Sequence, residues 1–272
     1  MNRPSPESRS HEQRWASAAD TFGRFVPAAE PERVADSFSR RLGPLGTFAF
    51  ETIGDMWSRP QLSRRDRSLL IISTLATQAR DEELVVHTEI GIRHGLTRGE
   101  IEEVLPHIAA YAGFPAAMAA SRHIDEGLRR AEGTEQLSPR TGATPKSDAE
   151  RDADAAATRA SVRGHEPRHP AEDLAEMTAR LGDLGEVAYR WAYGEIWARS
   201  EMSRRDRSIV VISILTSLGV DRALAIHVQG GLNHGLSRTE IEEIITHLGL
   251  YAGIPKAIEA MIVAREIFDG AQ

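Results

Sequence analysis

The chain carries two copies of one sequence pattern, and this duplication limits the folds that it can adopt. The hexapeptide SRRDRS occupies Ser63–Ser68 and returns 140 positions later at Ser203–Ser208. The same offset relates further pairs: Trp57 and Trp197, His87 and His227, His94 and His234, and His107 and His247. Two copies of one unit in one chain predict two similar domains that pack together as a pseudo-dimer.

Each copy has the periodicity and the punctuation of helices. Leu69–Ala79 is apolar on nearly all sides and runs for more than ten residues without a turn signal, which favours a buried central helix over a strand. Ser63 and Thr97 are typical N-caps, and Gly95 and Gly113 are typical helix stops. We therefore predict an all-α chain of two tandem helical domains.

Composition places the domain boundaries. Residues 1–30 form a polar N-terminal segment in which Trp15 to Phe25 predicts a short helix. Residues 31–131 and 171–272 form the first and second domains. Between them, residues 132–170 contain almost no large apolar side chains, which indicates a flexible linker with at most a transient helix around Ala153 to Val162.

Charge and composition exclude several classes of function. The formal net charge of −7 argues against a general binder of nucleic acid or membrane surfaces. The chain has no cysteine, which removes disulfides, thiol catalysis and cysteine-ligated metals. No apolar run approaches the ~20 residues that span a bilayer, and the first residues lack an apolar signal core. We expect a soluble cytoplasmic protein.

One helical segment carries the main functional signal. In EELVVHTEIGIRHG (residues 82–95), Glu83, His87 and His94 share one face of the predicted helix, where a purely structural stripe would be apolar. The second copy, ALAIHVQGGLNHG, keeps both histidines but has Ala223 in place of Glu83. This asymmetry predicts that the first copy houses the chemistry.

Three segments resemble the carboxymuconolactone decarboxylase family: LSRRDRSLLIIS, the stretch from EELVVH to HGL, and EIEEVLPHIAAYAGFPAAM. The likeness covers roughly Leu45–Arg130 and Met177–Phe268. It implies an all-α, alkylhydroperoxidase-like fold that assembles into trimers or hexamers, and cofactor-free decarboxylation of an unsaturated lactone acid. Relatives that reduce peroxides use a Cys-x-x-Cys pair. Arg80 and Glu83 stand at those positions here, so the thiol chemistry does not transfer.

The implied reaction assigns roles to residues. His87 suits the proton transfer, and Glu83, one turn away, would orient the ring and raise its pKa. An arginine would clamp the substrate carboxylate. We predict His87 and Glu83 as catalytic residues. The predicted substrate-binding residues are His94, Arg80, Arg67, Trp57, His227 and His234.

We predict no metal and no cofactor, a small-molecule substrate, a homotrimer, and no nucleic-acid or membrane partner. Several alternatives remain open at this point. Glu83 and His87 would also suit a solvated surface pair or a metal site, and His94 a contact with the end of its helix. The tryptophans and SRRDRS suit structural roles, with an ion pair inside each domain. An isomerase, a cyclase or a non-catalytic scaffold would use the same fold.

Overall fold

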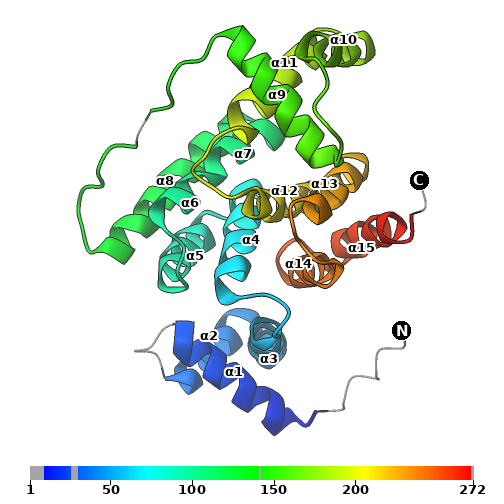
Figure 1. Cartoon of the computed structure of the whole chain (residues 1–272). Helices are drawn as coiled ribbons and strands as arrows, with labels where there is room; N and C mark the ends of the chain where they lie inside the picture. Colours follow the sequence, from blue (N-terminus) through cyan, green and yellow to red (C-terminus); the bar gives the residue numbers. More distant parts are fainter. Residues whose placement is uncertain (1–8, 26–29, 141, 271–272) are drawn as a thin grey trace. The chain divides into compact units, whose positions relative to one another are not determined.

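The computed structural model describes residues 9–25, 30–140 and 142–270, and in these ranges every regular element is helical (Figure 1). The predicted all-α class is confirmed. The chain forms two compact units, Met1–Leu62 and Ser63–Gln272. Unit 1 contains α1 (His11–Phe25), α2 (Pro31–Leu42), the short 3-10 helix η1 (Gly43–Leu45) and α3 (Gly46–Ser58).

Unit 2 contains the remaining helices. From the first copy come α4 (Arg64–Thr77), α5 (Asp81–Arg93), α6 (Arg98–Glu102), α7 (Val104–Tyr111) and α8 (Phe114–Glu132). From the second come α9 (Asp148–Arg163), α10 (Pro170–Leu181), α11 (Asp183–Val187), the π-helical segment η2 (Ala188–Trp197), α12 (Arg204–Leu218), α13 (Asp221–Asn233), α14 (Arg238–Tyr251) and α15 (Ile254–Phe268). Among the residues described, no helix is both long and apolar enough to cross a bilayer.

Local sequence signals place most helix ends. Ser63 accepts a hydrogen bond from the backbone N–H of Asp66 and so caps α4, and Thr97 forms a capping box with Glu100. Pro106 coincides with a break, because the first copy has two short helices, α6 and α7, where the second has the continuous α14. A proline inside a helix removes a hydrogen bond and clashes with the preceding turn, and Thr246 at the equivalent position does neither.

The predicted flexible linker is wrong over residues 148–163, which form α9. Ser147 and Glu150 make a capping box at its start, and Ala155 and Ala160 are buried. The helix packs against η2, where a Cβ on Gly194 would lie 2.3 Å from the carbonyl oxygen of Arg151. The small side chains that made this segment resemble a linker allow the two helices to approach closely. The described residues 135–140 and 142–146 contain no helix.

Helix α9 extends the duplication beyond the predicted boundaries, because α1 is its counterpart in the first copy. Both helices begin after a serine, Ser10 and Ser147, that is hydrogen bonded to the residue three positions later. The ion pair from Arg14 in α1 to Asp55 in α3 recurs as Arg151 in α9 with Glu195 in η2. The predicted helix from Trp15 to Phe25 thus exists as α1. The rest of the predicted N-terminal segment, residues 1–8 and 26–29, lies outside the described residues.

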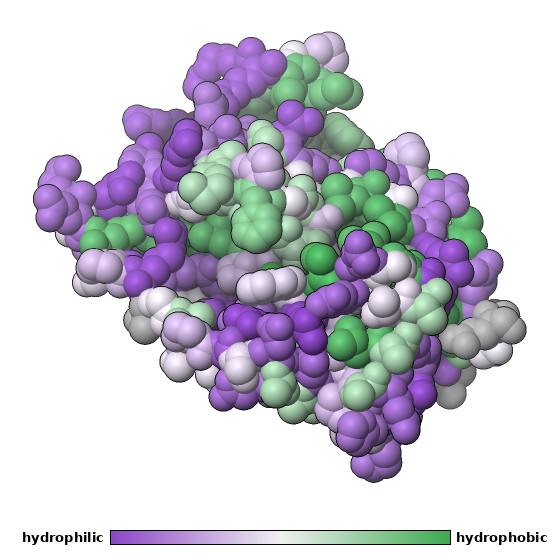
Figure 2. All heavy atoms as spheres, turned by 90° about the horizontal axis from the view of Figure 1, so that it is seen from above, coloured by the Kyte–Doolittle hydropathy of each residue, from purple (hydrophilic) through white to green (hydrophobic). Residues whose placement is uncertain are grey.

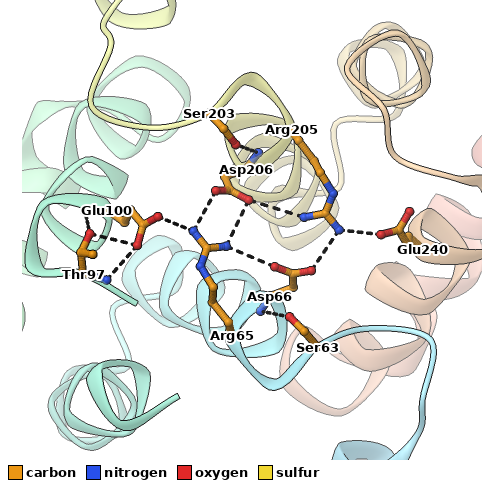
Figure 3. Close-up of polar contacts among 9 residues, drawn as sticks. All are labelled: Ser63, Arg65, Asp66, Thr97, Glu100, Ser203, Arg205, Asp206 and Glu240. Atoms are coloured by element: carbon orange, nitrogen blue, oxygen red, sulfur yellow. Dashed lines mark hydrogen bonds and ion pairs between the residues drawn. The ribbon is translucent and has the colours of Figure 1, made fainter. Parts of the chain in front are cut away.

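The two copies meet within unit 2, where the buried helices α4 and α12 pack against each other (Figure 1). At their first turns the ion pairs are reciprocal (Figure 3). Arg65 binds Asp206, and Arg205 binds Asp66. SRRDRS therefore links the copies to each other, in addition to the ion pairs that the sequence suggested inside each domain, Arg65 with Asp66 and Arg205 with Asp206. This exchange is the pseudo-dimer that the duplication predicts, and unit 2 includes helices from both copies.

Candidate active site

Equivalent histidines on α5 and α13 each face a tyrosine from the other copy. The ring of His87 on α5 lies edge-on to that of Tyr251 from α14, with centroids 5.6 Å apart. On α13, Nε2 of His227 lies 3.0 Å from the hydroxyl oxygen of Tyr111, which comes from α7. Unit 2 therefore holds two composite sites, which we name the His87 site and the His227 site, and both copies contribute to each.

Next to each composite site, a buried arginine from one copy binds a glutamate and contacts a histidine from the other copy. Arg67 on α4 is fully buried and binds Glu243 at 2.8 Å and Nδ1 of His247 at 2.7 Å, both on α14. His247 in turn lies 5.6 Å from Tyr251. Breaking a buried pair of this kind typically destabilises a protein by about 3–5 kcal/mol. Arg67 is therefore held by protein groups, and its predicted contact with the substrate stays a prediction.

The arrangement recurs at the His227 site. Arg207 on α12 is fully buried and binds Glu103 at 2.8 Å, and one of its nitrogens lies 3.4 Å from Nε2 of His107. Glu103 also binds Arg199. Because the glutamate comes from the first copy and both arginines come from the second, the copies are joined by buried charge in both directions.

The second histidine of each pattern lies at the end of its helix. His94 follows α5 and its Nδ1 lies 2.8 Å from Oγ of Ser68. His234 follows α13, and its two ring nitrogens lie 2.8 Å from Oγ of Ser208 and 2.7 Å from Oγ of Ser161. These contacts hold the rings beside α4 and α12, so their predicted contact with the substrate stays a prediction.

The predicted partnership of Glu83 with His87 is wrong in its electrostatics. Glu83 is exposed, and its side chain makes no hydrogen bond or ion pair with any residue in the described ranges. Burial, with a smaller contribution from the charge of His94, lowers the pKa of His87 to about 4, whereas a neighbouring carboxylate would raise it. His87 is therefore neutral at pH 7.

The His227 site is closed by an aromatic side chain. Trp197 from η2 stacks on His227 with centroids 5.4 Å apart and an interplanar angle of 13°, and its indole N–H donates to the hydroxyl of Tyr111 at 2.8 Å. Burial lowers the pKa of His227 to about 3. Trp57, the sequence equivalent of Trp197, lies in unit 1, where its buried ring meets Phe25 with centroids 4.5 Å apart. Its predicted contact with the substrate stays a prediction.

Pockets for small ligands are typically about 300–1,000 Å³. One of about 580 Å³ opens beside Tyr251 of the His87 site. It lies between the ends of α4, α12 and α14 and the starts of α5 and α15. Its lining residues are Thr77, Gln78, Arg80, Ser217, Leu218, Leu250, Tyr251, Ala252, Gly253 and Lys256.

Two cations line this pocket. Arg80 is exposed, and its side chain makes no hydrogen bond or ion pair with a residue that the structure describes. Lys256, from the start of α15, donates to the backbone carbonyl of Ser217 and has no carboxylate partner in the described part of the chain. The pocket can therefore receive an anion next to the aromatic ring that contacts His87.

The two positive charges of this pocket are absent from the equivalent positions of the repeat. At the offset of 140, the positions equivalent to Arg80 and Lys256 are Val220 and Ala116. Sequence reasoning missed Lys256 and gave Tyr251 no role in the site. A comparison of the copies would have found the lysine, because a charged residue in one copy and an alanine in the other is the same signal that singled out Glu83.

Comparison with known proteins agrees with this architecture. A sequence profile described as the carboxymuconolactone decarboxylase family matches residues 48–126 and 183–266, once in each copy. The chain belongs to the carboxymuconolactone decarboxylase family. This confirms the resemblance seen in the sequence, and the two matched segments agree with two tandem helical copies of one fold.

Individual relatives are similar over one copy. A 4-carboxymuconolactone decarboxylase of Acinetobacter baylyi is 35% identical over 101 residues, which is 37% of this chain and 75% of that protein. A nitrosuccinic acid decarboxylase of Metarhizium robertsii is 33% identical over 81 residues, covering 30% of this chain and 57% of that protein. A crystal structure from Burkholderia xenovorans LB400, described as a gamma-carboxymuconolactone decarboxylase subunit, covers 98% of this family member with a TM-score of 0.53 and 20% identity. That likeness concerns the fold alone.

Proposed function

We propose that this protein is a decarboxylase of a small organic acid, and that the reaction takes place at the His87 site. The observation that carries the proposal is the pocket with Arg80 and Lys256, whose lining includes Tyr251, the residue whose ring contacts His87. Both curated relatives are named as decarboxylases. Nitrosuccinic acid has two carboxyl groups, and a pocket with two cations matches such a substrate.

The proposed substrate is an unsaturated lactone acid, a keto acid or a similar acid with an electron sink beside the leaving carboxylate. The bond to the carboxylate carbon breaks, carbon dioxide leaves, and the electron pair moves onto the oxygen of the sink. Negative charge therefore stays on the reacting molecule. A cation near the sink oxygen gains interaction energy as the charge arrives there, and this lowers the barrier. We assign this role to Arg80 or Lys256.

The product carbon then needs a proton, and we assign its delivery to His87. The ring is neutral in the free protein because burial lowers its pKa to about 4. A bound anion within a few ångströms favours the imidazolium and raises that pKa. Substrate binding would therefore charge the histidine that later donates the proton, while Tyr251 holds the ring and borders the pocket. This scheme needs no cofactor and leaves Glu83 without a catalytic role.

The first copy thus provides His87 and Arg80, and the second provides Tyr251 and Lys256. In the His227 site, the side chains of Trp197 and Tyr111 both contact the histidine. The positions equivalent to Arg80 and Lys256 are the apolar Val220 and Ala116. We assign that site a structural role. The homotrimer and the cytoplasmic location stay predictions.

Release of carbon dioxide from a panel of acids tests the proposal, beginning with 4-carboxymuconolactone and nitrosuccinic acid. Loss of an acid–base residue typically slows an enzyme by ~10²–10⁴, and we expect this for His87→Gln. Arg80→Gln and Lys256→Gln distinguish the two cations: loss of the one that only holds the bound anion should raise KM, and loss of the one beside the sink oxygen should lower kcat. The matched control His227→Gln should cost less than about tenfold, a guess scaled from the same range.

The outcomes separate the alternatives. A changed product without carbon dioxide would replace decarboxylation by isomerisation or cyclisation. Loss of turnover in His227→Gln, with His87→Gln intact, would move the chemistry to the other site. Absence of turnover on every acid, with both variants folded, would favour a scaffold.

A further inference from the structure

A second pocket, of about 410 Å³, lies between α9, α10 and α13 of the second copy. Its lining residues are Val162, Arg163, Arg180, Arg222, Ala225, Ile226 and Gln229. Three arginines from three helices and one amide therefore surround an apolar floor. This composition is unusual on a chain whose formal net charge is −7.

The positive charge of this pocket is largely uncompensated. Arg180 and Arg222 are exposed, and their side chains make no hydrogen bond or ion pair with a residue in the described ranges. Arg163 approaches Glu176 only at 3.9 Å, and Glu176 is already bound by Arg168. Guanidinium groups bind carboxylates and phosphates through paired N–H donors, so a group with two negative charges would satisfy several of them at once.

The repeat offers an internal comparison. The first-copy positions equivalent to Arg222 and Gln229 are Glu82 and Glu89, so the face of α13 that lines the pocket carries the opposite charge from the same face of α5. The basic pocket is thus a property of the second copy alone. The apolar floor of Val162, Ala225 and Ile226 would receive a short hydrocarbon part of the ligand.

We propose that this pocket binds a small organic dianion, with a phosphate or dicarboxylate head on the arginines and an apolar body on the floor. The site is separate from the pocket of Arg80 and Lys256, shares no lining residue with it, and does not depend on the proposed reaction. Its size excludes a macromolecule as the occupant of the cavity itself.

Calorimetric titration of the full chain tests the proposal with two probes, phenyl phosphate and benzylmalonate, and with benzyl alcohol as the uncharged control. Both anions should bind and the alcohol should not. The stronger of the two identifies the head group that the pocket prefers. A hydrogen bond to a charged group contributes about 1.5–3 kcal/mol, so Arg180→Gln and Arg222→Gln should each weaken binding by about tenfold or more.

Two controls place the binding in this pocket. RLGPLG at Arg41 corresponds to RLGDLG at Arg180, so Arg41→Gln changes the first-copy counterpart of Arg180 and should leave the affinity unchanged. The double variant Arg80→Gln, Lys256→Gln removes the cations of the other pocket, which the proposed function also makes an anion site, and binding at Arg180 and Arg222 should persist in it. Equal affinity in the parent and in Arg222→Gln, or loss of binding only in the Arg80 and Lys256 variant, would overturn the proposal. So would an absence of heat with both anions.

Discussion

Five histidines of unit 2 are held in their neutral form by burial. Desolvation lowers the pKa of His107 and His227 to about 3, and that of His87, His94 and His234 to about 4. An unfolded chain returns each ring to an ordinary pKa of about 6.5. Protons are therefore taken up when the chain unfolds in mild acid, and the folded state loses stability there.

We accordingly predict that the free energy of unfolding is flat above pH 6.5 and falls as the pH drops from 6.5 toward 4. Each histidine that gains a proton on unfolding contributes a slope of about 1.4 kcal/mol per pH unit. Urea unfolding at a series of pH values measures the total. His107→Gln removes one fully buried ring and should make the slope shallower. Parallel curves for the parent and the variant would contradict this account.

Backbone strain at Ala79 gives a second prediction at this scale. Ala79 has a φ of 52°, and its counterpart Gly219 has a φ of 70°. The left-handed region costs an L-residue roughly 1–2 kcal/mol, while glycine loses about 0.5–1 kcal/mol more entropy on folding than alanine. Ala79→Gly should therefore stabilise the protein by about 0.5–1 kcal/mol, and Gly219→Ala should destabilise it. Thermal melts of both variants measure the effect. A lower melting temperature for Ala79→Gly or a higher one for Gly219→Ala would show that other contacts determine the stability.

At the residue scale, the sequence predicted which residues share a helix face better than it predicted which side chains contact each other. The face shared by Glu83 and His87 was derived from spacing, but spacing does not say which edge of that face is solvated. The buried residues of α5 include Leu84 and Thr88, which leaves Glu83 in solvent. Tyr251 reaches His87 from the other copy, and no local pattern predicts a contact over so long a separation.

Single elements show why composition misleads. Helix α9 contains few large apolar residues, so it was predicted as linker, yet its alanines pack closely against η2. Hydrophobic periodicity finds helices that bury leucine and isoleucine more readily than helices that bury alanine against glycine. The helices with apolar periodicity and clear caps, such as α4 and α5, could be predicted from the sequence.

The packing of α9 predicts a contrast between two alanines. Ala155 is fully buried and Ala157 is exposed. Ala155→Leu should destabilise the protein by about 1–3 kcal/mol, because extra methyl groups in a packed contact force neighbours apart. Ala157→Leu should stay within about 0.5 kcal/mol of the parent, as surface substitutions usually do. Equal melting temperatures for both variants would indicate that Ala155 is not packed and that the segment is a linker.

For the whole molecule, exposed apolar side chains support the predicted self-association. Figure 2 shows hydrophobic residues gathered in patches between hydrophilic ones on one face. On α8 and α15, Phe114, Met118, Ile254 and Ile258 are 52–75% exposed. Such residues in matching positions on two equivalent helices favour burial against further copies of the chain.

We expect light scattering at micromolar concentration to give a homotrimer, about three times the chain mass of 29.9 kDa. Met118→Lys and its second-copy counterpart Ile258→Lys place a charge among the exposed apolar side chains and should shift the protein toward smaller species. A parent protein that scatters as a 29.9 kDa monomer would contradict the prediction.

The exchange of residues between the copies has a consequence for how such a gene can change. In each copy, the helix with the tyrosine (α7 or α14) forms part of one site, and the helix with the histidine (α5 or α13) forms part of the other. Neither half of the gene can be discarded, because each encodes part of both sites. Fusion also frees the two sites from remaining identical, as they must in a symmetric dimer. The His87 site can then retain the proposed chemistry, while the His227 site, which Trp197 closes, is retained for its structural role.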